Sequence, residues 1–326
     1  MSPTAPGPGG QQGRQPGRLG VGVVGAGRVG AVLGNALRAV GHAVVGASGI
    51  SADSRERIET MLPGVPALDV PEVVERAELV LLTVPDDALA DLVTGLATLG
   101  AWQPGQIVVH TAGAFGTDVL APARERGAIP LAIHPAMTFT GTSMDLGRLT
   151  GCTFAVTGPG PVLPIGQALV VEIGGEPVVV AEEARPLYHA ALAHGANHLV
   201  VLVAQAAHAL AAAGVEQPDR LLGPLLGAAL DGAVRSASSV SDATTASTSG
   251  VASLTGPVVR GDAGTVAAHL TQLAGLAGRD PSAADLPPTY RALARAATAR
   301  ALAGGRIGTT QAQDLLDVLA DAQEDR

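Results

Sequence analysis

From residue 19 onward, short apolar runs alternate with longer segments whose apolar positions recur at helical spacing. The runs are too short to be helices and are almost continuously apolar, as expected for strands buried on both faces. The expected strands are 19–24, 42–47, 78–84, 106–110, 128–134, 153–157 and 177–180. Strands that alternate with helices in this way predict an α/β fold, with a parallel sheet covered by helices on both faces.

The pattern changes after about residue 181, where strand-like runs give way to helical periodicity alone. Residues 182–214 contain no proline apart from Pro186 and predict one long helix, with Gly195 as the place of a bend. Shorter helices are expected at 218–234, 263–276, 288–304 and 310–323, and the Ser/Thr-rich residues 236–255 are expected to form a flexible loop. We therefore predict a disordered tail at 1–18, an α/β domain at 19–181 and an all-helical domain at 182–326.

All 20 basic residues of this 326-residue chain are arginines, because the sequence contains no lysine. Schiff-base enzymes, P-loop nucleotide hydrolases and reductases with a lysine acid are therefore excluded. The net charge of −9 and the aromatic content of 2% argue against nucleic-acid binding. The single cysteine, Cys152, excludes an internal disulfide and any cysteine-based zinc site, and is typical of a reducing cytoplasm.

The sequence shows no N-terminal secretion signal. The longest apolar stretch, 199–214, is interrupted by Gln205 and His208 and is too short to cross a bilayer as a helix. We therefore expect a soluble cytoplasmic protein without a membrane partner.

Residues 25–30, Gly-Ala-Gly-Arg-Val-Gly, match the pattern G-x-G-x-x-G directly after the first expected strand and at the start of a helix. This context separates a dinucleotide-binding turn from a chance match in a glycine-rich chain. The three glycines would allow, in order, a tight turn, close approach of the pyrophosphate, and close packing of the helix on the strand. The expected cofactor-binding residues of this loop are Gly25, Gly27, Arg28, Val29 and Gly30.

The residues after the second expected strand bear on the choice between NAD and NADP. Enzymes that use NAD place a carboxylate at this point, where it binds the ribose hydroxyls. Here the strand is followed by Ser48 and Ser51, and the first carboxylate is Asp53. Both serines could bind a 2′-phosphate, and Arg55 or Arg57 could pair with it. We therefore expect NADP, and NAD with Asp53 at the ribose is the alternative.

Several longer motifs resemble known families of nucleotide-dependent enzymes. Residues 81–86, Leu-Leu-Thr-Val-Pro-Asp, resemble the segment that lies along the cofactor in pyrroline-5-carboxylate reductases and prephenate dehydrogenases. Residues 133–137, Ile-His-Pro-Ala-Met, are similar to the His-Pro-Met element of prephenate dehydrogenases. With Tyr-His-Ala at 188–190 and Thr-Gly-Pro-Val-Val-Arg-Gly-Asp at 255–262, residues 19–310 are most similar to a bacterial family that joins a Rossmann-like domain to a helical domain of unknown function.

This resemblance implies an NADP-dependent oxidoreductase with a Rossmann-like parallel sheet. Its helical domain would be similar to that of 6-phosphogluconate dehydrogenase and would form a homodimer. Val84 and Pro85 would then lie beside the cofactor, with the nicotinamide between them and the residues from Thr111 to Gly113. A deazaflavin, which related folds use, is a further alternative cofactor.

Two histidines are expected beyond the carboxyl ends of strands, where ligands of open α/β sheets bind. Hydride transfer needs a proton donor or acceptor beside it, and a histidine with a pKa near 6.5 suits that role. The resemblance assigns it to His134, since the matching histidine of prephenate dehydrogenases binds the substrate oxygen. His110 is expected to be structural, because the segment from Thr111 to Gly113 would contact the nicotinamide through its backbone.

The long helix carries further polar residues, among them His189, His194, Asn197 and His198. His194 and His198 share a helix face, but no third ligand is evident, so we predict no metal site. Enzymes of the 6-phosphogluconate dehydrogenase type carry Lys-x-x-x-Asn on this helix. Without lysine, His194 or His189 would have to replace that acid, and Asn197 could orient the substrate.

Arg260 precedes Asp262 at an expected helix start, and it would either bind a carboxylate or phosphate of the substrate or pair with Asp262. Two functions fit these residues. The first is hydride transfer between NADP and a small carboxylated metabolite, with His134, His194, Asn197 and Arg260 as candidate catalytic residues. The second is NADP binding without catalysis, in a redox sensor or interaction protein. The missing lysine favours the second, whereas the polar residues at the expected cleft favour the first, which we adopt.

Overall fold

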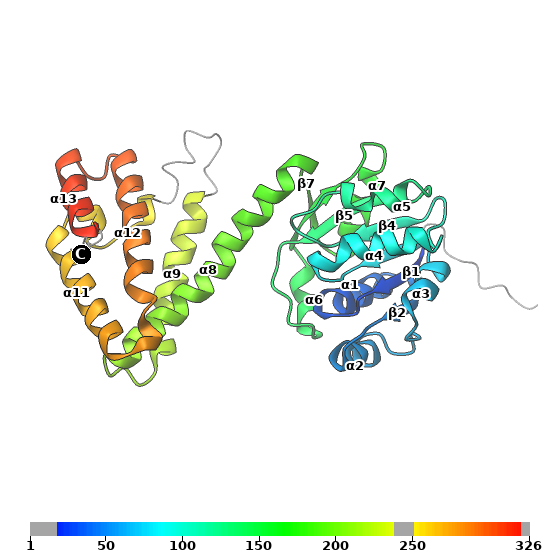
Figure 1. Cartoon of the computed structure of the whole chain (residues 1–326), viewed down its shortest axis with the longest axis horizontal. Helices are drawn as coiled ribbons and strands as arrows, with labels where there is room; N and C mark the ends of the chain where they lie inside the picture. Colours follow the sequence, from blue (N-terminus) through cyan, green and yellow to red (C-terminus); the bar gives the residue numbers. More distant parts are fainter. Residues whose placement is uncertain (1–17, 238–250, 321–326) are drawn as a thin grey trace, which may run out of the picture. The chain divides into compact units, whose positions relative to one another are not determined.

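The computed structural model describes residues 18–237 and 251–320 (Figure 1). In this part of the chain, seven strands form one sheet in the order β2-β1-β3-β4-β5-β6-β7. The strands are β1 (Gly20–Val24), β2 (Ala43–Ser48), β3 (Leu79–Leu82), β4 (Ile107–His110), β5 (Ile129–Pro135), β6 (Thr153–Thr157) and β7 (Glu176–Val179). The expected strands are confirmed in number and order.

One pair of strands departs from the predicted parallel sheet. β5 runs antiparallel to β6, whereas the other neighbouring pairs are parallel. The segment that joins them contains only the six-residue helix α6 (Met144–Leu149), and an antiparallel neighbour needs no long crossover helix. The prediction of a wholly parallel sheet is therefore wrong at this pair. β1, β3, β4 and β5 remain parallel, so their carboxyl ends lie at one edge of the sheet.

Helices cover both faces of the sheet (Figure 1). One face packs against α1 (Arg28–Ala39), α2 (Ala52–Met61), α6 and α7 (Leu163–Glu172), and the other against α3 (Val70–Arg76), α4 (Asp86–Thr98) and α5 (Ala121–Arg124). An apolar core lies on each face of the sheet, and alternate residues of a strand point into one or the other. Leu81 of β3, for example, packs into the core beside α1, and Leu82 packs into the core beside α4. The strands are thus buried on both faces, as their continuous apolar pattern predicts.

The chain continues as helices after β7. They are the short η2 (Glu182–Ala184), then α8 (Arg185–Ala212), α9 (Pro218–Ala237), α11 (Ala263–Arg279), α12 (Leu286–Ala303) and α13 (Thr309–Leu319), with the 3-10 turns η3 (Val251–Ser253), η4 (Val258–Arg260) and η5 (Pro281–Ala283). Leu270 of α11, Ala301 of α12 and Leu315 of α13 contribute to a common apolar core. The predicted order, α/β and then all-helical, is confirmed.

The chain forms two compact units, of which the first ends at His194 and the second begins at Gly195. This division falls inside α8, so Arg185, Tyr188 and His189 at the start of that helix belong to the unit that contains the sheet. Contacts between these three residues and the sheet are therefore contacts within one unit.

Parts of three predicted segments lie outside the described residues. These are residues 1–17 of the predicted tail, 238–250 of the predicted Ser/Thr-rich loop and 321–326 at the chain's end. The predicted loop is flanked by helical elements in the structure: α9 extends to Ala237 before it, and η3 begins at Val251.

Within the ranges 18–237 and 251–320, one helical stretch, Glu182–Ala212, is long and apolar enough to cross a bilayer by those two criteria. This stretch is longer than residues 199–214, to which the sequence-based prediction applies. The two criteria are weak grounds for a membrane span, because the core helix of a soluble protein also satisfies them. Moreover, Arg185 in the first turn of α8 is fully buried and donates hydrogen bonds to backbone oxygens of β5 and β6.

Candidate active site

Four segments meet at the carboxyl edge of the sheet. Gly25 follows β1, residues 83–85 follow β3, residues 111–113 follow β4, and His134 lies near the end of β5. These strands are parallel neighbours in the order β1-β3-β4-β5, so the four segments follow one another along one edge. Ligands of open α/β sheets bind at such an edge. The predicted cofactor-binding segments and His134 therefore lie in a common region of the first unit.

The glycine-rich loop has the backbone geometry that its motif requires. Gly25 has a φ of +91°, in the left-handed region that favours glycine. A Cβ at Gly30 would overlap Oγ1 of Thr83 and lie 2.5 Å from the carbonyl oxygen of Gly25, so the helix packs this closely only because residue 30 is glycine. A Cβ at Gly27 would meet only the carbonyl oxygen of Gly25, at 3.9 Å. The loop is thus closed where the helix packs and open where a pyrophosphate would approach, which fits a dinucleotide.

Thr83 fixes the position of this loop. Its hydroxyl donates to the carbonyl oxygen of Gly25 at 2.6 Å, and its N–H donates to the carbonyl oxygen of Val24 at 2.9 Å. Cγ1 of Val84 lies 3.1 Å from the place of a Cβ at Gly25, and Pro85 is the exposed residue that precedes α4. Val84 therefore lies next to the glycine-rich loop, as a role beside the cofactor requires, and the role of Pro85 stays a prediction.

Helix α1 begins at Arg28 with no side-chain cap and no acidic residue in its first turn. The first N–H groups of a helix lack partners within the helix, and the helix dipole favours an anion there. A carboxylate in this turn would repel a phosphate, so its absence suits a pyrophosphate. Arg28 itself is exposed, whereas Val29 is half-buried and packs against the apolar core.

The hydroxyl groups of Ser48 and Ser51, near the end of β2, differ in how many hydrogen bonds they already make within the protein. Ser48 accepts the N–H of Ala26 at 2.7 Å through its carbonyl oxygen, and its Oγ lies 3.2 Å from the N–H nitrogen of Gly25. Ser51 caps α2, because its Oγ accepts the N–H of Ser54 at 3.1 Å, and its hydroxyl donates to Oγ of Ser54. Ser48 is therefore freer to donate to a ligand than Ser51. Their binding of a 2′-phosphate stays a prediction.

His134 of β5 forms a hydrogen-bonded pair with Tyr188 from the first turn of α8. Nδ1 of His134 lies 2.9 Å from the hydroxyl oxygen of Tyr188, and the ring centroids are 5.6 Å apart and nearly perpendicular. The ring of His189 is a second neighbour at 6.1 Å. A Cβ at Gly113 would lie 3.1 Å from Nε2 of His134 and 2.5 Å from Cδ2 of His189. Nε2 of His134 thus faces the 111–113 segment, beside which the nicotinamide is expected.

Arg185 places a fully buried guanidinium next to this pair. Its Nε donates to Oγ1 of Thr157 at 2.7 Å, and its Nη2 donates to two carbonyl oxygens of β5 and β6 at 2.8 and 3.0 Å. Among the described residues, Nη1 has no hydrogen-bond partner. The guanidinium carbon lies 5.9 Å from the centre of the Tyr188 ring. The positive charge of Arg185 therefore acts on both members of the pair, His134 and Tyr188.

Burial and this charge set the protonation states of the pair. Burial first, and then the charge of Arg185, lower the pKa of His134 to about 4. Burial raises the pKa of Tyr188 above its ordinary value, and the charge of Arg185 opposes that rise. At neutral pH the pair consists of a neutral imidazole and a protonated hydroxyl. The pKa of His134 is thus far below the value near 6.5 that the sequence suggests for a catalytic histidine.

His110 at the end of β4 has the structural role expected of it. It is fully buried, its Nδ1 accepts the N–H of Ala112 at 3.2 Å, and its Nε2 lies 2.7 Å from the carbonyl oxygen of Gly116. Burial lowers its pKa to about 4, so the ring is neutral and donates from Nε2. The carboxylate of Glu182 also binds this loop, by accepting the N–H of Thr117 at 2.7 Å.

The other predicted site residues belong to the later part of the chain. His194 ends the first unit and Asn197 lies in the second, and both are exposed residues of α8. Arg260 is an exposed residue of η4, and Asp262 caps α11 by accepting the N–H of Thr265 at 2.9 Å. Within the described residues, no ion pair joins Arg260 to Asp262. The charge of Arg260 nevertheless contributes to lowering the pKa of Asp262, after the hydrogen bonds from Thr265, so both roles of Arg260 stay predictions.

Two residues of the His134 cluster, Arg185 and Tyr188, have no individual role in the sequence-based prediction. Their spacing of three residues puts them on one face of the long helix, which a sequence can show. That this face meets β5 and β6 depends on how the helix follows β7, which the sequence does not show. Among residues 18–237 and 251–320, no group of three or more His, Cys, Asp or Glu side chains could hold a metal ion.

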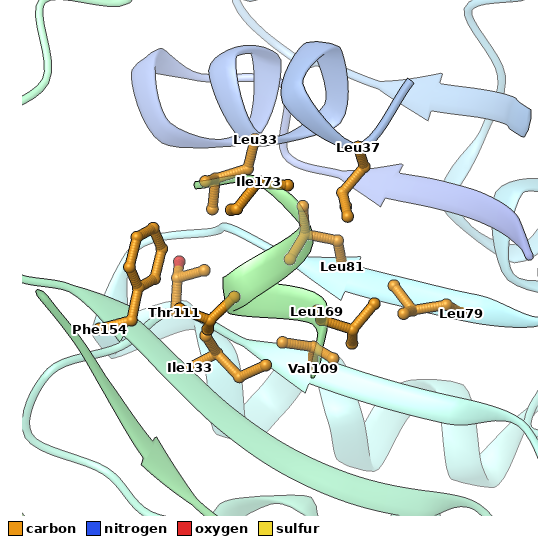
Figure 2. A pocket seen from close by; sticks show the side chains of 11 residues that line it. Leu33, Leu37, Leu79, Leu81, Val109, Thr111, Ile133, Phe154, Leu169 and Ile173 are labelled. Atoms are coloured by element: carbon orange, nitrogen blue, oxygen red, sulfur yellow. The ribbon is translucent and has the colours of Figure 1, made fainter. Parts of the chain in front are cut away.

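An apolar cavity lies between α1, α7 and the sheet (Figure 2). Leu33 and Leu37 of α1 and Phe154 of β6 are among its lining residues, and Thr111 is the polar one. Its volume is about 30 Å³, enough for about two water molecules. The cavity is thus a packing gap of the core rather than a substrate site. The side chain of Thr111 lines this cavity, and the contact of its backbone with a cofactor stays a prediction.

Two domain families match the chain in sequence. The Rossmann-like domain matches residues 5–135, and the domain of unknown function DUF2520 matches residues 152–297. No curated protein matches the chain.

Several solved structures share the fold. A candidate NADP oxidoreductase from Bacteroides fragilis is 21% identical with a TM-score of 0.66, and the match covers 86% of this chain and 98% of that one. An imine reductase from a Pseudomonas species is 18% identical with a TM-score of 0.59, covering 93% and 100%. An imine reductase variant from Myxococcus stipitatus in complex with NAD⁺ is 17% identical with a TM-score of 0.57, covering 92% and 99%. At these identities the likeness shows a shared fold.

The two domain matches follow one another as the elements of the structure do. The Rossmann-like match ends at the last residue of β5, Pro135. The DUF2520 match begins just before β6 and includes α8, α9 and α11. The chain therefore consists of a Rossmann-like domain followed by a DUF2520 domain.

Proposed function

We propose that this chain is an NADP-dependent oxidoreductase that transfers a hydride between nicotinamide and a small, carboxylated metabolite. The observation that carries the proposal is the His134–Tyr188 pair, which lies at the same sheet edge as a dinucleotide-type loop that is open at Gly27. The pair can move a proton, and the loop can bind the cofactor. The shared fold with an NADP oxidoreductase candidate and with imine reductases supports the same general chemistry.

The residues present fit a nicotinamide dinucleotide. Gly25, Gly27 and the uncapped start of α1 would bind the pyrophosphate, while Val84 and the 111–113 segment would flank the nicotinamide. When bound, the nicotinamide supplies or accepts the hydride. NADP is favoured over NAD because β2 ends at Ser48 without a carboxylate for the ribose hydroxyls. NAD and a deazaflavin are the alternatives.

In the direction of reduction, the substrate atom next to the hydride acceptor needs a proton. Nε2 of His134 faces the 111–113 segment, so its N–H would donate that proton. Nδ1 of His134 would take the hydroxyl proton of Tyr188, 2.9 Å away, so the imidazole stays neutral throughout. The proton on Nδ1 then returns to the tyrosinate while Nε2 takes a proton from solvent, which restores both groups for the next turnover. Oxidation of the substrate runs through the same steps in reverse.

This relay suits the low pKa of His134. A histidine with a pKa of about 4 is almost never an imidazolium at neutral pH, so it cannot act as an acid alone. A relay needs no imidazolium, because one ring nitrogen releases a proton as the other takes one. The charge of Arg185 lowers the cost of the tyrosinate, since it favours the deprotonated form of Tyr188.

The substrate's acid group is assigned to Arg260, whose exposed guanidinium could bind a carboxylate through two parallel hydrogen bonds. Asn197 is proposed to orient the substrate, and His194 is the second candidate acid in place of the missing lysine. These three roles rest on the resemblance and on residue chemistry alone.

A second candidate function is NADP binding without catalysis, in a redox sensor or interaction protein. The absence of lysine and the low pKa of His134 favour it, because both remove ordinary proton donors from the site. The two functions differ in one observable, which is turnover of bound NADPH.

A second copy of the chain is the proposed macromolecular partner, bound through the helical unit. Val200 of α8 and Leu225 and Val234 of α9 are among the large apolar side chains that this unit exposes. The apolar residues of α8 are spread around the helix rather than gathered on one face, which is typical of a helix covered by protein from several directions. Burial of these side chains in a homodimer would remove them from water.

We also propose that the protein acts in the cytoplasm without nucleic-acid or membrane partners. The net charge of −9 opposes binding to nucleic acid. A single cysteine fits a reducing compartment. The hydrogen bonds that hold Arg185 inside the first unit oppose insertion of the whole of α8 into a bilayer.

The test is NADPH oxidation in the presence of small cyclic imines and 2-oxo acids. The wild type should consume NADPH with at least one of these substrates, and His134→Ala should slow turnover about 10²-fold or more. His269→Ala, in the second unit, is the matched control and should keep the rate. Full activity of His134→Ala would remove the catalytic assignment. NADPH binding without oxidation of any tested substrate would leave the sensor function as the better account.

A further inference from the structure

We propose that the turn after β5, residues 138–145, makes this site select the 2′-phosphate of NADP. The turn would do so by contacting the side chains of Arg28 and Arg57 and so fixing their positions. The inference rests on the proposed cofactor and goes beyond it, since it names the residues that would separate NADP from NAD. Neither Gly141 nor Asp145 of this turn has a role in the sequence-based prediction.

The turn is fixed by a buried carboxylate. Asp145 at the start of α6 is fully buried, and its carboxylate accepts the N–H groups of Thr140 and Gly141, both at 2.8 Å, and the hydroxyl of Thr140 at 3.0 Å. Burial alone would raise the pKa of Asp145, but these hydrogen bonds hold it below its ordinary value, so the carboxylate stays charged. The neighbouring Phe139 packs into the core of the sheet. The turn is therefore anchored on both sides of Gly141.

Gly141 lies directly against the two arginines. A Cβ at this position would be 2.9 Å from Cγ of Arg28 and 3.0 Å from Nε of Arg57. Arg28 is the first residue of α1, and Arg57 lies on α2, the helix that follows β2. Gly141 also has a φ of +81°, where a side chain would strain the backbone. The glycine thus lets the turn approach both arginine side chains at once.

The two guanidinium groups have little compensating negative charge. Within the described residues, the guanidinium of Arg28 makes no hydrogen bond or ion pair. Arg57 has only a contact of 4.0 Å with Asp53, whose side chain is 79% exposed. Exposed pairs of this kind contribute little free energy. Two arginine side chains that meet at one glycine, without a close carboxylate, favour a doubly charged anion such as a phosphate monoester.

Their place in the fold indicates which phosphate this is. α2 follows β2, and in a dinucleotide-binding sheet the residues after the second strand face the ribose of the adenosine. Ser48 lies at this end of β2, and the first carboxylate after it in the sequence is that of Asp53. A phosphate on the 2′-oxygen of that ribose is the group that two arginines and a serine would bind, whereas a bare ribose would prefer a carboxylate.

The experiment compares calorimetric titrations with 2′,5′-ADP and 5′-AMP, which differ only in the 2′-phosphate. The wild type should bind 2′,5′-ADP at least about tenfold more tightly. Arg57→Gln and Gly141→Ala should reduce this ratio towards one and leave the affinity for 5′-AMP unchanged within about twofold. Gly147→Ala is the matched control in α6, because a Cβ there would meet no atom within 4 Å. It should keep the wild-type ratio.

The outcomes separate this inference from the proposed function. Binding of both nucleotides with equal affinity by the wild type would overturn the inference and leave a nicotinamide cofactor possible as NAD. Retention of the wild-type ratio by Arg57→Gln and Gly141→Ala, in variants with an unchanged circular dichroism spectrum, would also overturn it. Absence of binding of either nucleotide would contradict the proposed cofactor itself.

Discussion

The hydroxyl oxygen of Tyr188 lies 2.9 Å from Nδ1 of His134, which joins the first turn of the long helix α8 to the end of β5. The opposite ring nitrogen of His134 faces the segment at Gly113. One imidazole therefore bridges a buried hydroxyl and the region in which a nicotinamide would react. This arrangement gives the proposed proton relay a direction and makes Tyr188 its source.

Replacement of Tyr188 by phenylalanine tests the relay. The ring and its packing remain, but His134 loses the proton that it would take up at Nδ1, so kcat should fall about 10²-fold. The KM for NADPH should change by less than about twofold, because Tyr188 has no part in cofactor binding. Steady-state kinetics with the best substrate measure both parameters.

The chain contains a matched control for this variant. Tyr290 in the second unit bonds Nδ1 of His269, also at 2.9 Å and with nearly perpendicular rings. Tyr290→Phe removes an equivalent hydroxyl away from the proposed site and should leave kcat unchanged. An equal loss of kcat in both variants would mean that Tyr188 acts only through stability.

Alanine at Gly30 tests the role of the glycine-rich loop. The added Cβ would overlap Oγ1 of Thr83 and displace the start of α1, which should cost about 1–3 kcal/mol of unfolding free energy and weaken NADPH binding. Gly95→Ala is the control, since a Cβ at this exposed position of α4 meets no atom within 4 Å. It should stabilise the protein by about 0.5–1 kcal/mol. Urea unfolding and calorimetric titration check both, and unchanged binding by Gly30→Ala would contradict the cofactor assignment.

The buried His110 predicts how stability depends on pH. Burial lowers its pKa to about 4 in the folded state, whereas the unfolded chain takes up this proton near pH 6.5. Protons therefore favour the unfolded state between these values, so stability falls as the pH decreases from 6.5 to 4. His110 alone should account for about 3 kcal/mol of this loss. An NMR titration of its ring in the folded protein checks the cause, and a midpoint near 6.5 would contradict it.

The proposed homodimer predicts a specific sensitivity to charge. Leu225 of α9 is 59% exposed in the single chain, and glutamate at this position should convert a dimer into a monomer in light scattering. Leu99→Glu is the control, because Leu99 is 71% exposed but lies at the end of α4 in the first unit. That variant should remain dimeric. A monomeric wild type at micromolar concentration would contradict the proposal.

The sequence predicts the glycine-rich loop well because its signal is local. A buried strand, three glycines and a helix start follow one another within a few residues, and the structure has the φ of Gly25 and the contact at Gly30 that this order requires. The same holds for the alternation of strands and helices, whose apolar runs match β1 to β7. Contacts between distant segments are not predictable in this way.

The antiparallel pair of β5 and β6 is the first example. Apolar strands have the same pattern in either direction, so alternation with helices predicts the direction only where a long crossover helix is present. Arg185 is the second example. Arginine is ordinarily exposed, and only the fold shows that backbone oxygens of β5 and β6 accept its hydrogen bonds. The pKa of His134 follows from this buried charge and from burial itself, which no local motif contains.

The most direct test of the account is a calorimetric titration of the folded wild-type chain with NADPH, NADH and a deazaflavin. We predict saturable binding of one NADPH per chain, weaker binding of NADH and no binding of the deazaflavin. Thermal unfolding should then shift upward with NADPH concentration, because a ligand that binds only the folded state stabilises it. No heat and no shift with any of the three compounds would contradict the central claim that this edge of the sheet binds a nicotinamide cofactor.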